Sequence, residues 1–256
     1  MPDPSPLQID VNLVPVEDIL GLRDQYRCAM NCQIVHDSYH ARGFTDSYIL
    51  RLDGEVVGYG SVAGEPGGVR ETIKEFYVLP AYRGASLPLF RKLIAAAEPR
   101  WIEAQTNDLL LTLLLFDCAL EVTSDRILFA DARTTSHRSR DAIFRSLTEA
   151  DQAQAFPHLS EPVGAWGLEV GGEIVATGGL MFHYNPPYAD IHMEVAAAHR
   201  RKGYGTYLVQ ELKRLSYEQG SIPAARCHEK NRASRLTLEG AGMLPCARII
   251  RGRITS

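Results

Sequence analysis

The chain lacks the features that mark several large classes of protein. Its 256 residues include 27 Lys and Arg against 31 Asp and Glu, so the net charge is −4 and the basic surface of a general nucleic-acid binder is missing. No apolar run reaches the roughly 18 residues of a membrane-spanning helix, and the opening residues lack the basic and apolar parts of a signal peptide. The cysteines, 5 in number and scattered, are typical of reduced thiols rather than of a disulfide framework. These absences lead us to expect a cytoplasmic protein with no nucleic-acid or membrane partner.

The composition is that of an ordinary globular protein. Hydrophobic residues make up 45% and charged residues 23%, which is enough apolar material to bury a full core. The length fits one large domain or two of average size. No His or Cys spacing fits a zinc site, so we expect no metal.

One structural unit is present twice in the sequence. Asp53-Gly54 and Gly171-Gly172 each lie between two apolar runs, which is the pattern of a two-residue β-hairpin turn. Each hairpin is followed by another strand-like run, a basic turn and an amphipathic helix. The second glycine of the turn lies 29 residues before Arg83 in the first copy and 28 residues before Arg200 in the second. This repeat predicts an α/β (α+β) protein of two tandem domains, each with a mixed, largely antiparallel twisted sheet flanked by helices.

A polar stretch separates the two copies. Residues 131–140 interrupt the hydrophobic periodicity, which is typical of a domain boundary. We therefore expect one domain in residues 1–134 and a second in residues 135–256.

The turn that precedes the helix of the second copy has the composition of an anion site. "RRKGYG", from Arg200 to Gly205, combines three basic side chains with two glycines. The unpaired N–H groups and the dipole of a helix N-terminus attract anions, and glycine leaves room for them to approach. A nucleotide P-loop and a dinucleotide fingerprint both require glycines that this stretch lacks. The pattern suits a pyrophosphate, and a basic turn that merely caps a helix is the competing interpretation.

Two motifs together carry a family resemblance. Residues Arg200–Gly205 match the pattern [RQ]-x-x-G-x-[GA], and Asn231, Ser234 and Gly242-Met243 match the pattern of the helix that follows the next strand. On these motifs the sequence resembles the GNAT superfamily of acyl-CoA-dependent N-acyltransferases over about residues 141–254. The resemblance implies acetyl-CoA as cosubstrate and an amine, on a small molecule or a peptide, as acceptor.

The resemblance also implies which residues bind coenzyme A. Backbone amides of the basic turn would hold the pyrophosphate, and the edge of the preceding strand would bind the pantetheine arm. Asn231 would hold the arm from the other side. Because asparagine is a good N-cap residue, a purely structural role at the start of the helix is the other interpretation of Asn231, and the two are compatible. The implied set is Met193, Val195, Ala196, Arg200, Arg201, Lys202, Gly203, Tyr204, Gly205, Thr206, Asn231 and Ser234.

Acyl transfer to an ordinary amine requires a base, because an alkyl amine with a pKa near 10.4 is protonated at pH 7. Asp190, His192 and Glu194 alternate along one predicted strand and so share a face, unless a β-bulge re-aims one of them. We expect Glu194 to be the catalytic base, with His192 as the second candidate. A solvated or inter-helix face is the alternative interpretation of the three residues.

The proton donor for the departing thiolate is the least defined part of the site. Many members of the family carry a tyrosine where this chain has Leu238. Solvent, or another group such as Tyr184 or Tyr188, would then protonate the thiolate.

The first copy resembles the same unit with its anion site damaged. Ser86 and Pro88 stand where the second copy has its two glycines, and proline offers no N–H to a phosphate. The helix led by Asn107 is apolar on nearly every side, which suggests burial against another layer. We expect residues 1–134 to be a degenerate GNAT-like domain that is structural or shapes the acceptor pocket, and residues 135–256 to be the catalytic domain.

The second copy is also short of one strand. After Gly242-Met243 the sequence has room for a single strand, where a unit of this family normally has two. The second copy would therefore complete its sheet with a strand from elsewhere, the first domain being the candidate. The hypothesis is an N-acetyltransferase that acts by direct attack, and its alternative is a non-catalytic coenzyme A-binding sensor or interaction module.

Overall fold

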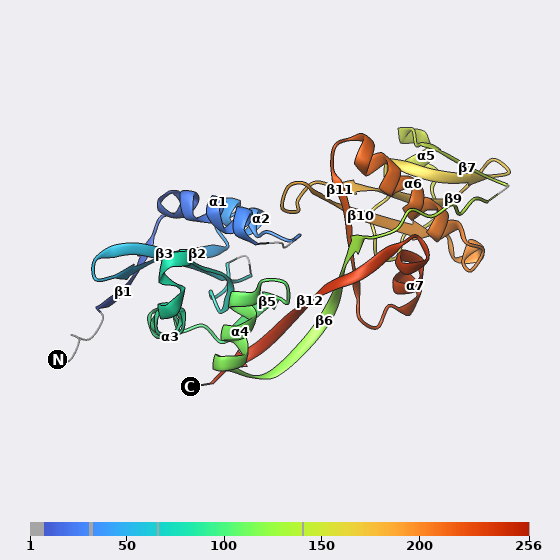
Figure 1. The fold of residues 1–256 in the computed structure, drawn as a ribbon. Helices are drawn as coiled ribbons and strands as arrows, with labels where there is room; N and C mark the ends of the chain where they lie inside the picture. Colours follow the sequence, from blue (N-terminus) through green and yellow to red (C-terminus); the bar gives the residue numbers. More distant parts are fainter. Residues whose placement is uncertain (1–7, 31–32, 66, 140, 256) are drawn as a thin grey trace. The chain divides into compact units, whose positions relative to one another are not determined.

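The computed structural model describes residues 8–30, 33–65, 67–139 and 141–255. They form two compact units, one of residues 1–124 with 248–256 and the other of residues 125–247 (Figure 1). The division of function predicted at residue 134 stays a prediction.

The first unit has the elements expected for one copy of the repeat. Its strands are β1 (Ile9–Val14), β2 (Thr45–Leu52), β3 (Glu55–Ala63), β4 (Thr72–Val78), β5 (Trp101–Gln105), the first part of β6 (Ala119–Asp131) and the last part of β12 (Met243–Ile254). Its helices are η1 (Val16–Ile19), α1 (Leu20–Ala29), α2 (Asp37–Ala41), η2 (Pro80–Ala85), α3 (Ser86–Ala97) and α4 (Leu109–Cys118), where η marks a 3₁₀ helix.

The second unit repeats this order. Its further strands are β7 (Ala142–Ser146), β8 (Trp166–Val170), β9 (Glu173–Met181), β10 (Tyr188–Val195) and β11 (Ile222–His228). Its helices are α5 (Glu149–Gln154), η3 (Ala197–His199), α6 (Tyr204–Glu218) and α7 (Arg232–Gly240). Within the described residues of both units, no helix is long and apolar enough to cross a membrane.

All twelve strands belong to one mixed sheet, which confirms the predicted fold class. The strand order is β1-β2-β3-β4-β5-β12-β6-β11-β10-β9-β8-β7. Neighbouring pairs are antiparallel except β4 with β5 and β10 with β11, among the pairs whose register is described. One parallel pair thus lies in each unit.

The two predicted hairpins are present. Asp53 and Gly54 join β2 to β3 with φ of 51° and 85°, and Gly171 and Gly172 join β8 to β9 with φ of 59° and 85°. Positive φ at both central residues is the type I′ turn, whose twist matches that of the flanking strands. The two residues of each turn were therefore enough to predict the hairpin from the sequence.

The second unit takes a strand from the end of the first copy, as predicted. Residues Arg126–Ala130 of β6 pair antiparallel with β11, and Ile127 and Phe129 lie in the core of the second unit. In return, Ile249–Arg253 of β12 pair antiparallel with β5 in the first unit. The part of the sheet in each unit is therefore completed by a strand from the other copy.

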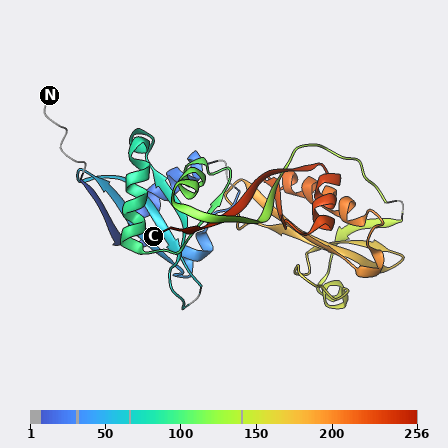
Figure 2. The same ribbon diagram turned by 90° about the horizontal axis from the view of Figure 1, so that it is seen from below.

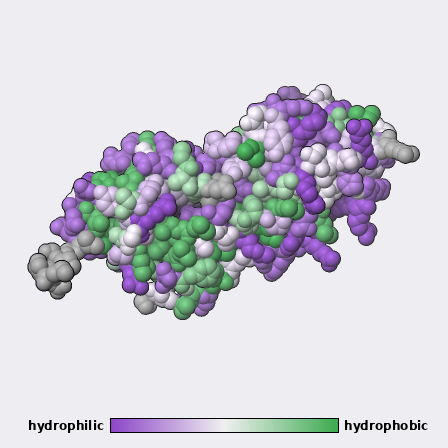
Figure 3. Space-filling model, in the orientation of Figure 1, coloured by the Kyte–Doolittle hydropathy of each residue, from purple (hydrophilic) through white to green (hydrophobic). Residues whose placement is uncertain are grey.

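In the first unit, helices cover both faces of the strands (Figure 1). α3 and α4 pack on one face around Phe76 and Phe90, and α1 packs on the other, where Tyr26 meets Tyr59 and Tyr77. The predicted burial of α4 holds for only one of its sides. Its other side exposes apolar side chains, seen as the green area over α4 in Figure 3. These exposed residues are Leu109, Leu113 and Phe116.

In the second unit, the predicted amphipathic helix is α6. Its stripe of Leu208, Val209 and Leu212 is fully buried, and Gly220, with φ of 76°, follows its C-cap as predicted. The opposite face of the strands faces residues 149–164, including the short α5 (Figure 2). The two faces of β10 therefore have different surroundings, which matters for the site.

A buried charge network ties α1 to the sheet of the first unit. The Arg23 guanidinium donates from Nε and Nη2 to the two oxygens of Glu75 at 3.0 and 2.9 Å, with side chains 5% and 1% exposed. His40 and Tyr59 also contact Glu75, at 3.1 and 3.2 Å. Burial alone would raise the pKa of Glu75, but the hydrogen bonds from His40 and Arg23 lower it well below its ordinary range. The carboxylate is thus charged and fully paired.

The borrowed strand predicts that the second unit does not fold without it. A fragment of residues 135–256 lacks the part of β6 that pairs with β11, so we expect it to be insoluble or unfolded. A fragment of residues 125–256 is the matched control, because it differs only in keeping that strand segment and should give a cooperative thermal melt. A cooperative melt of the shorter fragment would contradict the argument.

The Arg23–Glu75 pair predicts a large local contribution to stability. Arg23→Met leaves a buried carboxylate without its main partner and should lower the free energy of unfolding by about 3–5 kcal/mol in urea titrations. Arg214→Met removes the exposed helix pairs to Glu211 and Glu218 and should change it by roughly 0.5 kcal/mol or less. Equal effects of the two substitutions would refute the assignment.

Candidate functional site

The second unit is open where its two parallel strands part. β10 and β11 pair over three residues only, Tyr188–Asp190 with Ile222–Ala224, although both strands continue beyond them. β10 keeps its other neighbour, β9, as far as Val195. The second half of β10 therefore has one paired edge and one edge that β11 has left.

Backbone groups of β10 face this open edge. Ala196 donates its N–H to Val175 O toward β9, at 2.9 Å. Because consecutive residues of a strand direct their backbone groups to opposite edges, Met193 and the N–H of Val195 face the open edge. Such an edge pairs readily with an extended ligand that carries amide groups.

The basic turn lies directly beside this edge. Gly203 is the N-cap of α6 with φ of 85°, and Arg201 has φ of 63°, so the chain turns through two left-handed residues. A Cβ on Gly205 would lie 3.0 Å from Met193 Cε and 3.4 Å from Val195 Cγ2. Gly203 thus permits the turn, and Gly205 permits α6 to pack closely on β10.

The N-terminus of α6 is left without a side-chain cap. Its first N–H groups, from Tyr204 to Thr206, have no partner in the helix. Arg201 and Lys202 are exposed and form no salt bridge with any described residue. Arg200 is committed elsewhere, because its Nε donates to Val195 O at 3.1 Å. The turn therefore combines unpaired N–H groups with two available cations, as an anion site requires.

The second predicted motif has a structural role. Asn231 is the N-cap of α7, and its side-chain oxygen accepts the N–H of Ser234 at 3.0 Å. In the first unit the equivalent N-cap is Asp108, whose Oδ1 accepts from Leu111 at 3.2 Å, so the expectation that Asn107 leads that helix is off by one residue. Contact of Asn231 and Ser234 with coenzyme A stays a prediction.

The three polar residues of β10 share one face, as the alternation predicts. Ile191 is in the apolar core with α6, and Met193 and Val195 pack against that core, so Asp190, His192 and Glu194 face the opposite side. The register between β9 and β10 is unbroken from Asp190 to Val195. The bulge considered for re-aiming Glu194 is therefore absent from these pairs.

Glu194 is bound tightly by backbone. Its oxygens accept N–H groups from Leu159 at 3.0 Å and from Ser160 and Glu161 at 3.2 Å each. Its side chain is 7% exposed, with Arg200 at 3.5 Å and His158 at 3.7 Å. Burial alone would raise its pKa, but the three backbone hydrogen bonds lower the pKa of Glu194 below its ordinary value. A carboxylate so stabilised is a weak proton acceptor, and it positions residues 159–161 over β10.

His192 has a free ring nitrogen on the same face. Nδ1 is buried and has no hydrogen-bond partner among the described residues. A Cβ on Gly179, its partner in the β9 register, would lie 2.8 Å from Nε2, so this glycine leaves room for the ring. Burial lowers the pKa of His192 below 6.5, which keeps the ring neutral at pH 7 and able to accept a proton.

A polar cluster adjoins His192 at the start of the open edge. Asp190 is 2% exposed and lies near His183 Nε2 at 3.4 Å and Arg226 Nε at 3.7 Å. Asp190 Oδ1 and the Tyr184 hydroxyl are both buried. Burial, the charge of Asp190 and a hydrogen bond to it raise the pKa of Tyr184, so its hydroxyl stays protonated. His192 Nδ1 is buried without a hydrogen-bond partner among the described residues and is available to a ligand or to water.

Neither Leu238, which stands where many members of the family have a tyrosine, nor Tyr204 forms part of this cluster. Leu238 is buried in the apolar core, and the Tyr204 hydroxyl donates to Asp141 at 2.9 Å. His158 and Arg226 are additional polar residues at the site that the sequence did not indicate. His158 has no periodic signal because it lies in an irregular segment, and it bonds to Thr177 at 3.0 Å.

The comparisons agree with this architecture. Residues 130–242 match the family model described as the acetyltransferase (GNAT) family. An acetyltransferase of the GNAT family from Colwellia psychrerythraea has a similar structure, with a TM-score of 0.77 and 15% identity over 96% of this chain and 100% of that one. No curated protein sequence matches the chain.

Two further solved structures share the fold. A tandem GNAT protein from the clavulanic acid biosynthesis pathway matches with a TM-score of 0.56 and 13% identity over 97% of this chain and 99% of that one. A GCN5-related N-acetyltransferase from Sphaerobacter thermophilus matches with a TM-score of 0.52 and 16% identity over 99% of this chain and 97% of that one. At these identities the similarity concerns the fold. Residues 130–242 thus match the sequence pattern of the acetyltransferase (GNAT) family, and the chain as a whole shares the fold of these solved structures.

Proposed function

We propose that the second unit transfers the acetyl group of acetyl-CoA to an amine. The observation that carries the proposal is the open edge of β10 beside the uncapped N-terminus of α6. The pyrophosphate would bind the N–H groups of residues 203–206 with Arg201 and Lys202, and the amide groups of the pantetheine arm would pair with Met193 and Val195. Bound acetyl-CoA supplies an acetyl thioester, and residues of β10 bind the pantetheine arm and accept the proton.

His192 is the base that the geometry favours over Glu194. Its Nδ1 is neutral and has no other partner, whereas both Glu194 oxygens already accept backbone hydrogen bonds. In direct attack, nitrogen bonds to the acetyl carbon as the carbon–sulfur bond breaks, and His192 accepts the proton that the amine loses. Solvent would protonate the departing thiolate, because Leu238 is apolar and buried.

The buried carboxylate of Asp190 favours a cationic acceptor. Asp190 and Tyr184 lie among His183, Arg226 and Glu161, so this region carries charges of both signs. A protonated amine would be attracted by Asp190 and would lose its proton near His192. The competing function, a non-catalytic coenzyme A-binding module, predicts binding without turnover.

Replacement of Gly203 tests the pyrophosphate site. Gly203→Pro removes an N–H and cannot adopt φ of 85°, so it should weaken acetyl-CoA binding by well over about tenfold, or roughly 1.4 kcal/mol. Gly203→Ala is the matched control, because a Cβ there meets no atom within 4 Å and the N–H remains, so it shows the effect of backbone strain at φ of 85° without loss of the donor. Calorimetric titration measures both, and unchanged affinity in Gly203→Pro would move the pyrophosphate elsewhere.

The pH dependence of kcat distinguishes His192 from Glu194. A neutral base acts above its pKa, so activity should fall as the pH drops through the pKa of His192, which lies below 6.5. His192→Gln should lower kcat by about 100-fold or more and abolish this acid limb, with KM for acetyl-CoA little changed. Glu194→Gln should instead lower the free energy of unfolding and keep the limb. Release of the coenzyme A thiol with a panel of primary amines measures the rates, and loss of the limb in Glu194→Gln alone would reverse the assignment.

A further inference from the structure

The first unit contains two cavities where its own parallel strands part. β4 and β5 pair only at Thr72–Ile73 with Trp101–Ile102 and then diverge, as β10 and β11 do. One cavity is small and the other large, and both are lined by Tyr26 and Asp108. The hydroxyl of Tyr26 donates to Asp108 Oδ2 at 2.8 Å, so this pair borders both.

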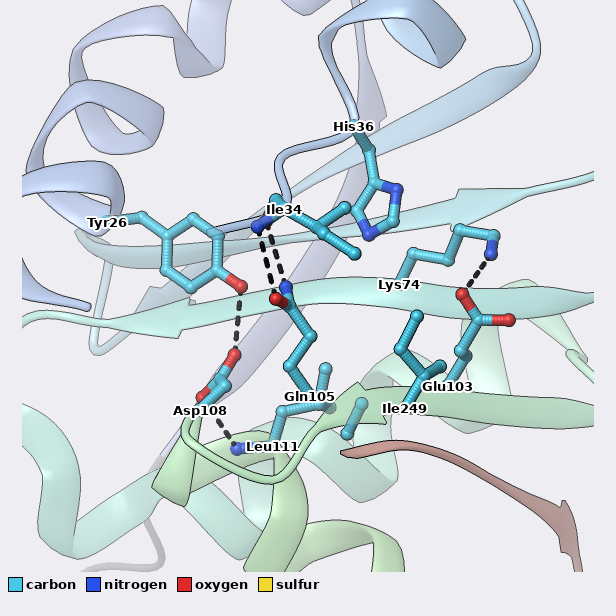
Figure 4. Close-up of a pocket in the computed structure, with 10 residues that line it drawn as sticks. Tyr26, Ile34, His36, Lys74, Glu103, Gln105, Asp108, Leu111 and Ile249 are labelled. Atoms are coloured by element: carbon cyan, nitrogen blue, oxygen red, sulfur yellow. Dashed lines mark hydrogen bonds and ion pairs between the residues drawn. The ribbon is translucent and has the colours of Figure 1, made fainter. Parts of the chain in front are cut away.

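The small cavity, of about 10 Å³, is nearly filled by side chains (Figure 4). The amide of Gln105 donates to Ile34 O at 2.8 Å and accepts Ile34 N–H at 3.1 Å, like a neighbouring strand. Lys74 and Glu103 form an ion pair across the same opening. These contacts thus bridge part of the gap between β4 and β5 that is open in the second unit.

The large cavity, of about 240 Å³, remains beyond the Tyr26–Asp108 pair. Phe76 and Tyr77 of β4 line one part of it, and Met30 after α1 and Leu110 of α4 line another. These walls are apolar and aromatic. Pockets that bind drug-sized ligands have volumes of roughly 300–1,000 Å³, so this cavity suits a smaller molecule with an apolar body.

The charges at the large cavity favour an anion. Arg83 is exposed and forms no salt bridge with a described residue. Asp108 is 7% exposed, and each of its oxygens already accepts a hydrogen bond, from Leu111 N–H and from Tyr26. Burial raises the pKa of Asp108, and the nearby charge of Arg83 lowers it. Arg83, which forms no ion pair with a described residue, is the positive charge at this cavity.

We propose that this cavity of the first unit binds a small organic carboxylate whose apolar body lies between Phe76, Tyr77 and Leu110 and whose charge pairs with Arg83. A guanidinium binds a carboxylate through two parallel hydrogen bonds, which gives the site its preference for this group. The site is distinct from the proposed acetyl-CoA site, which belongs to the second unit. The first unit is then a ligand-binding module as well as a structural one.

The test uses the full-length protein with 3-phenylpropanoate as the probe and labels the methionine methyl groups with ¹³C. The chain has 5 methionines, of which Met30 lines the cavity and Met181, Met193 and Met243 lie in the second unit. An aromatic ring in the cavity should shift the Met30 methyl resonance in a saturable titration and leave the three resonances of the second unit in place. The neutral 3-phenylpropanamide should bind about tenfold more weakly, and 3-phenylpropylamine more weakly still.

Two substitutions separate charge from shape. Arg83→Gln should weaken the carboxylate to the affinity of the amide and leave the amide unchanged, whereas Arg100→Gln, an exposed arginine of the same unit outside the cavity, should alter neither. Leu110→Phe fills the cavity and should weaken both probes, with a thermal melt to check folding. Absence of a saturable Met30 shift, a shift of Met193 instead, or equal affinity for carboxylate and amide would overturn the proposal.

Discussion

The short pairing of two parallel strands is the constraint on which the second unit depends. β10 and β11 stay together for three residues and then part, so the second half of β10 has one edge that no described strand pairs with. Backbone N–H and C=O groups on such an edge need hydrogen bonds, and a ligand with amide groups supplies them. The packing of Gly205 on Met193 and Val195 brings the N-terminus of α6 to the same place. The site for an extended anionic ligand thus follows from where two strands separate and where one helix begins.

In the first unit the parallel strands β4 and β5 also separate after a short pairing, but the space between them is lined differently. There Gln105 pairs with the backbone of Ile34 and bridges part of the gap, and Pro88 interrupts the N–H groups at the start of α3. The first change narrows the space between the strands, and the second weakens the anion site. What remains is a separate cavity bordered by the Tyr26–Asp108 pair. The two units therefore share one fold, and the sites that we propose in them differ in chemistry.

Buried carboxylates in both units show why charge alone does not identify a catalytic residue. Glu75 is charged because Arg23 and His40 pair with it, and Glu194 is charged because three backbone N–H groups bind it. In both, the pKa lies below its ordinary value, and the carboxylate positions neighbouring segments. His192 differs because a buried ring nitrogen has no partner. An available lone pair, rather than an acidic side chain, distinguishes the proposed base.

The sequence by itself determined the features that depend on neighbouring residues: the two I′ turns, the glycines of the basic turn, the α6 stripe and the shared face of Asp190, His192 and Glu194. It also indicated that the second unit takes a strand from elsewhere, because the residues after Gly242-Met243 suffice for only one of the two strands expected there. Only the tertiary structure decided what surrounds those residues. Glu194 is bound by a segment 33–35 residues earlier in the chain, and Gln105 meets Ile34 across 71 residues. Such contacts leave no periodicity in the sequence, because they arise where the sheet brings distant, irregular segments together, and they decide which residue is free to react.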